Sequence, residues 1–130
     1  KVSQHGRRIG GVIISSCQVA DREQNLIAVL NDGKINWVFG YTRAINWLGS
    51  TLLEVAIVES LVGTTDDFDQ NEDLLLETFG MALRKFNADA PFGANGEPLR
   101  DCIRLIQRAK FKKYPADLTS DVAAIAWGLK

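Results

Sequence analysis

The sequence predicts an α+β fold in which strands come first and helices follow. Three observations favour this order. Apolar and β-branched residues dominate three runs before residue 42, an Asn-Asp-Gly triplet separates the last two runs, and helical spacing of apolar residues begins after residue 70. We therefore expect an N-terminal three-stranded antiparallel meander packed against a C-terminal set of about three helices.

The strands of the meander are expected at residues 12–19, 26–30 and 35–41. Asn31-Asp32-Gly33 stands between the second and third runs. Asp-Gly is a strong hairpin signal because both residues tolerate a positive φ. The second and third strands are therefore expected to pair as a hairpin.

Large aromatic side chains occupy one face of the expected third strand. Trp37, Phe39 and Tyr41 alternate with smaller residues, so they point the same way. Base-stacking sheets interleave such aromatics with basic residues, whereas here only Lys34 and Arg43 flank the strand. We interpret the row as core beneath helices.

The segment at residues 52–62 fits two structures. Thr51 and Glu54 have the spacing of a capping box, which favours a helix. The many β-branched residues that follow favour a fourth strand instead. We favour the helix and leave the strand open.

About three helices are expected in the C-terminal half. Asn71 can cap the first, and Gly80 in its middle indicates close approach of another backbone. A second helix is expected at residues 99–112, and Thr119 can cap a short third one. The residues expected to be buried are Leu75, Leu76, Phe79, Ala82, Leu83 and Phe86 in the first helix, Leu99, Cys102, Ile103, Ile106 and Ala109 in the second, and Val122, Ile125, Ala126 and Leu129 in the third.

The 130 residues fit one domain, expected at 9–130, preceded by a basic N-terminal arm at 1–8. No apolar stretch is long enough to cross a bilayer, and no signal peptide is visible. Cys17 and Cys102 are expected to be reduced and buried. These features predict a cytoplasmic protein.

Charge is segregated along the chain although the formal net charge is −1. Residues 59–77 hold seven acidic side chains and no basic one, whereas basic side chains dominate residues 99–113. Such blocks create local fields that bias which partners a surface meets. The sequence therefore predicts an acidic and a basic surface.

Basic residues recur every four positions on the expected second helix, which would place them on one face. This face can be merely solvated, can meet an acidic protein surface, or can bind the phosphates of a nucleic acid. The candidate partner- or phosphate-binding residues are Arg100, Arg104, Arg108, Lys110, Lys112 and Lys113.

Three aromatic residues are candidate anchors of a protein interface. Trp127 lies about 140° from Val122 around the last helix, off the apolar stripe. Trp47 and Tyr114 are similar candidates. The alternative for Trp127 is burial under another part of the chain.

Signals for catalysis or cofactor binding are weak. Asp67, Asp69 and Asn71 have the spacing that begins a calcium loop, but the turn glycine and the final carboxylate of such a loop are missing. The lone histidine, His5, lies in the N-terminal arm. We expect no cofactor and no dedicated metal site.

We therefore expect a non-enzymatic interaction or assembly module that binds itself or another protein through its acidic (59–77) and basic (99–113) surfaces. The alternative is an RNA- or DNA-binding domain that uses the Arg100, Arg104, Arg108 and Lys112 stripe. A weaker alternative is a small carboxylate- or metal-dependent enzyme.

Overall fold

The computed structural model describes residues 10–15, 22–33, 35–62, 72–108 and 115–129. Within these residues four strands form one mixed sheet in the order β1-β2-β3-β4, and four α-helices pack on it. The fold is α+β, as the sequence predicts. The strands are β1 (Gly11–Ile13), β2 (Trp37–Tyr41), β3 (Ile103–Gln107) and β4 (Ala116–Asp117), and the α-helices are α1 (Glu23–Gly33), α2 (Trp47–Val62), α3 (Glu72–Leu83) and α4 (Thr119–Trp127).

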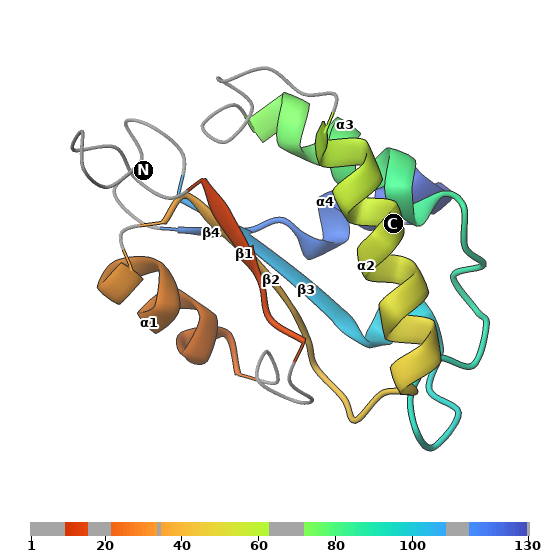
Figure 1. The fold of residues 1–130 in the computed structure, drawn as a ribbon. Helices are drawn as coiled ribbons and strands as arrows, with labels where there is room; N and C mark the ends of the chain where they lie inside the picture. The colour runs from red at the N-terminus through yellow and green to blue at the C-terminus, as the bar shows by residue number, and fades with distance from the viewer. Residues whose placement is uncertain (1–9, 16–21, 34, 63–71, 109–114, 130) are drawn as a thin grey trace.

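Helices cover both faces of the sheet (Figure 1). The helix α1 lies on one face, and α2, α3 and α4 lie on the other. Side chains alternate across a strand, so β2 supplies both cores. Val38 packs with Leu26 and Leu30 of α1, whereas Trp37 and Phe39 pack beneath the other three helices.

The predicted meander is wrong in its second strand. Residues 26–30 belong to α1, and Leu26 and Leu30 are fully buried on the face that contacts the sheet. Their four-residue spacing fits one face of a helix, and Gly33 ends the helix instead of turning a hairpin. Because α1 crosses over between them, β1 and β2 are parallel.

The predicted helix at residues 99–112 is also wrong over its described part, residues 99–108. A short 3-10 helix (Leu99–Asp101) is followed by β3, which pairs antiparallel with β2 on one side and β4 on the other. Ile103 and Leu105 enter one core, and Ile106 enters the other. Because β3 is a central strand, apolar residues enter cores on both of its faces, and their positions in the sequence also fit the spacing of a helix.

The ambiguous segment is a helix, and it begins earlier than predicted. Asn46 caps α2, because its Oδ1 accepts the backbone N–H of Leu48 at 2.9 Å. Thr51 lies inside the helix, where its hydroxyl donates to the Trp47 carbonyl at 2.8 Å. The capping box is therefore not formed.

The helices α3 and α4 form where the sequence predicts the first and third helices of the C-terminal half, but some of their details differ. Gly80 faces α4 so closely that a Cβ there would lie 2.6 Å from Cγ2 of Ile125. Thr119 is the first helical residue rather than the cap, and Asp117 Oδ1 accepts its N–H at 3.0 Å. Ile125, predicted to be buried, is 40% exposed.

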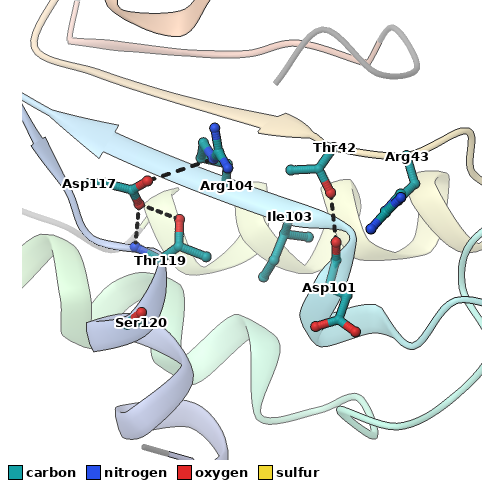
Figure 2. Close-up of a pocket in the computed structure, with 8 residues that line it drawn as sticks. All are labelled: Thr42, Arg43, Asp101, Ile103, Arg104, Asp117, Thr119 and Ser120. Atoms are coloured by element: carbon teal, nitrogen blue, oxygen red, sulfur yellow. Dashed lines mark hydrogen bonds and ion pairs between the residues drawn. The ribbon is translucent and has the colours of Figure 1, made fainter. Parts of the chain in front are cut away.

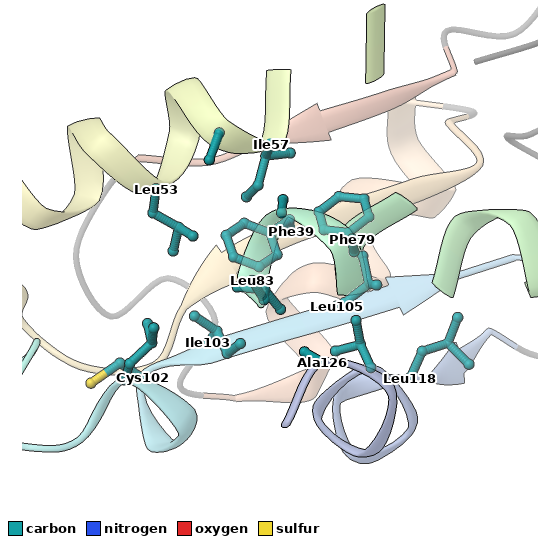
Figure 3. Packing of buried hydrophobic residues seen from close by; sticks show 14 of the residues in the cluster. Phe39, Leu53, Ile57, Phe79, Leu83, Cys102, Ile103, Leu105, Leu118 and Ala126 are labelled. Carbon is teal, nitrogen blue, oxygen red and sulfur yellow. The ribbon is translucent and has the colours of Figure 1, made fainter. Parts of the chain in front are cut away.

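The larger core is built on the aromatic row of β2 (Figure 3), which confirms that the row packs beneath helices. The Phe79 ring from α3 lies 5.1 Å from the Trp37 ring and 5.5 Å from the Phe39 ring, centroid to centroid. Leu53 and Ile57 of α2 reach into the same core. One face of α2 is thereby fixed against the sheet.

Candidate functional site

The basic residues predicted to form a helical stripe lie on different elements, and each described one has a partner within the chain. Arg100, on the 3-10 helix, pairs with Asp89 at 3.3 Å. Arg104, on β3, pairs with Asp117 at 3.6 Å, a diagonal neighbour on β4. The guanidinium of Arg108 donates to the Asn31 side chain.

The remaining residues of the predicted basic surface lie outside the described residues, namely Lys110, Lys112 and Lys113, and so does Tyr114. The same holds for the calcium-loop candidates Asp67, Asp69 and Asn71, for the 1–8 arm and for Cys17. Among the residues that the structure does describe, no cluster of three His, Cys, Asp or Glu side chains could hold a metal ion.

The two tryptophans proposed as anchors differ. Trp47, at the start of α2, is 75% exposed. Trp127 is half-buried, and its indole N–H donates to the carbonyls of Leu83 and Phe86 at 3.1 and 2.9 Å. These carbonyls belong to the last turn of α3 and the segment after it, so Trp127 ties α4 to the end of α3.

A polar depression of about 520 Å³ lies where the C-terminal end of β2 and the N-terminal end of β3 meet the start of α4 (Figure 2). It brings together Arg104, a candidate from the sequence, with residues that the sequence did not suggest as site residues. The lining residues are Thr42, Arg43, Asp101, Ile103, Arg104, Asp117, Thr119 and Ser120.

Hydrogen bonds within the chain occupy most polar groups of this depression. The Thr42 hydroxyl donates to the Asp101 carbonyl at 2.6 Å. The Thr119 hydroxyl donates to Asp117 at 2.6 Å and accepts the Leu105 N–H at 3.0 Å. These bonds hold the start of α4 against β3, which is a structural role.

The charges of the depression balance. Arg43 and Arg104 are matched by Asp101 and Asp117, so the lining carries no excess of positive charge to attract phosphate. Glu23, at the start of α1, lies against Asp117, and this contact between two carboxyl groups raises the pKa of Glu23. Ser120 and the two threonines are the hydroxyls of the lining, and the lining has no histidine to act as their base.

Two carboxylates of α2 that a carboxylate-dependent enzyme could use are also engaged in structure. Glu54 of α2 accepts the hydroxyls of Ser15 and Tyr41, each at 2.8 Å, and so ties α2 to the sheet. Glu59 accepts from Lys85 at 2.6 Å, and this bond lowers the pKa of Glu59. The acidic segment 59–77 thus contacts a basic residue of the same chain, Lys85, through Glu59.

A second surface is apolar and lies on α2, opposite its buried face. At 100° per residue, the eight exposed residues of α2 fill an arc of about 140°. The six apolar ones are 50 to 80% exposed. We call this set the outer face of α2, and it consists of Trp47, Leu48, Thr51, Leu52, Val55, Val58, Glu59 and Val62.

Trp47 is the only apolar residue of this face that was a candidate from the sequence, and Glu59 belongs to the predicted acidic surface. A signal for the rest was present, because residues 47–62 carry apolar side chains on every side of the helix, and a helix that is apolar all round is normally buried. No helix among the described residues is both long and apolar enough to cross a membrane.

Comparisons of the chain with protein-family models, with curated proteins and with solved structures find no match. What the chain does must therefore be inferred from its own residues.

Proposed function

We propose that this chain is a non-enzymatic assembly module that associates with itself through the outer face of α2. The observation that carries the proposal is a set of six apolar side chains, each at least half exposed, on one face of a single helix. With these exposures a copy offers on the order of 600 Å² of apolar surface, close to the ~800 Å² per partner of a standard interface. Patches of this size usually mark contact sites.

A protein surface suits this face better than a lipid surface does. Helices that lie on membranes carry Lys and Arg on their polar side, and anionic lipids attract those residues. The helix α2 contains neither residue type, and its two charged residues, Glu54 and Glu59, are acidic. The expected occupant is therefore protein.

A second copy suits the face because the face carries almost no charge. Its one charged residue, Glu59, is already paired with Lys85 of the same chain. An almost neutral apolar patch meets an identical patch without charge repulsion. It offers little to select a charged partner.

The contact surface proposed here replaces the segregated charges expected from the sequence. Arg100 and Arg104 already have partners, and exposed ion pairs contribute roughly 0–1 kcal/mol. Desolvated apolar side chains contribute more, at about 25 cal/mol per Å². The nucleic-acid and enzyme alternatives stay predictions, and no observation on the described residues favours either.

Light scattering on purified chain, over about 1 to 100 μM, tests the proposal. We expect the mass to rise above that of the monomer, and Leu52→Glu to abolish the rise. The matched control is Ala124→Glu, which adds the same charge at an exposed site on α4. A chain that stays monomeric, or one that Ala124→Glu affects as strongly as Leu52→Glu, contradicts the proposal.

A further inference from the structure

We infer that the outer face of α2 binds the same face of a second copy, with the two helices antiparallel about a two-fold axis at Val55. This inference rests on the proposed self-association and names the partner surface. An isologous contact of this kind closes at the dimer, whereas a contact with a different surface of the next copy would continue to grow.

The spacing of the apolar residues is the same in both directions along α2. Five of the six apolar residues of the face follow one another at intervals of four, three, three and four, namely Leu48, Leu52, Val55, Val58 and Val62, and Trp47 lies outside this pattern. Reversing the helix about Val55 therefore superimposes the pattern on itself. With this spacing, every one of these apolar levels on one helix meets an apolar level of the other in an antiparallel pair.

The sizes of these side chains complement one another in the same arrangement. Leu48 would lie opposite Val62 of the partner subunit. Leu52 would lie at the level of the partner's Val58. Each level on either side of the central Val55 then holds one leucine and one valine, so the axes can keep an even separation of about 8–10 Å. A parallel pair would place leucine on leucine at one end and valine on valine at the other.

Charge favours the antiparallel arrangement as well. In a parallel pair the two Glu59 side chains would lie at the same level. In an antiparallel pair centred on Val55 they lie about 12 Å apart along the helices. That separation exceeds the Debye length of about 8 Å at physiological salt, so their repulsion is largely screened. Each Glu59 also keeps its Lys85 partner.

A charge swap at the ends of the face tests the arrangement. The substitutions Leu48→Glu and Val62→Lys lie about 21 Å apart in one helix, so they do not pair within a chain. Each alone should weaken dimerisation at least tenfold in sedimentation equilibrium. Together they should restore dimerisation to within about tenfold of wild type at low salt, because the carboxylate introduced on one copy meets the ammonium group introduced on the other.

Mixing the two single variants provides a second measurement that does not need the double variant to fold. The mixture should form more dimer than either variant alone. A double variant and a mixture that both associate more weakly than the single variants would overturn the antiparallel arrangement. Assemblies that grow beyond the dimer and depend on Leu48 would overturn the inference and leave the proposed self-association standing. A wild-type monomer at every concentration would overturn both.

Discussion

Replacing Gly80 with alanine should destabilise the fold, although the same change stabilises most helices. In an open helix, Gly→Ala stabilises by about 1 kcal/mol. Here the new Cβ would lie 2.6 Å from Cγ2 and 3.4 Å from Cβ of Ile125. Normal carbon–carbon contacts are about 3.5–4.0 Å, so the overlap is roughly 1 Å.

This overlap is not easily relieved. Ile125 is β-branched and lies in α4, where essentially one χ1 rotamer is allowed, so its Cγ2 cannot move without moving the helix. Overpacking of this kind costs about 1–3 kcal/mol. With the gain in helix propensity subtracted, Gly80→Ala should lower the free energy of unfolding by about 1 kcal/mol.

A double-mutant cycle isolates the contact. Ile125→Ala removes Cγ2, so Gly80→Ala in that background should stabilise by about 1 kcal/mol, giving a coupling of about 2 kcal/mol. Urea denaturation at one fixed protein concentration measures all four chains. Stabilisation by Gly80→Ala in the wild-type background, or a coupling below about 0.5 kcal/mol, would refute the close approach of α3 to α4.

Three further predictions follow from other parts of the fold. Burial, with smaller contributions from Glu97 and Asp101, raises the pKa of the Cys102 thiol to about 11. In a Cys17→Ser chain, a thiol reagent at pH 8 should therefore modify Cys102 only when the chain unfolds. Fast modification of the folded chain would contradict the burial of Cys102. Because the pKa of Glu23 is raised in the fold, the stability linked to its protonation is complete below its ordinary pKa and is lost as pH rises through the folded value. Asp117→Asn should therefore lower the Glu23 pKa in an NMR titration, and an unchanged pKa would show that Asp117 is not the cause. Trp127→Phe leaves the Leu83 and Phe86 carbonyls without the indole donor, so it should lower the free energy of unfolding in urea by about 1–2 kcal/mol. A decrease below about 0.5 kcal/mol would mean that water replaces the indole.

The sequence predicted the elements whose local pattern has one structural solution. The alternation of residues 37–41 fits only a strand, and the apolar spacing of residues 75–83 fits only a helix. Even Gly80, a poor helix former, was interpreted correctly, because a glycine inside a helix usually marks a close neighbour.

Prediction from the sequence failed where one pattern fits two structures and distant residues decide between them. A four-residue interval places side chains on one side of a helix and also on one side of a strand, so Arg104 and Arg108 could not distinguish the two. Pairing of β3 with β2 and β4 settles the question. Leu26 and Leu30 fit either structure in the same way, and packing of α1 on the sheet decides for the helix.

The candidate site was partly within reach of the sequence. The polar depression forms where segments about 60 and 75 residues apart in the chain meet, so its composition could not be predicted from local patterns. The outer face of α2 could have been predicted, because residues 47–62 are apolar on every side once a helix is assumed.

The salt dependence of the wild-type molecular mass tests the central claim most directly. An apolar contact through α2 should give a monomer–dimer equilibrium that survives about 1 M salt, where the Debye length falls to about 3 Å, and that sulfate strengthens. Sedimentation equilibrium over a range of protein concentrations provides the measurement. A chain that remains monomeric at about 100 μM, or a dimer that dissociates in high salt as charge pairing would, contradicts association through the outer face of α2.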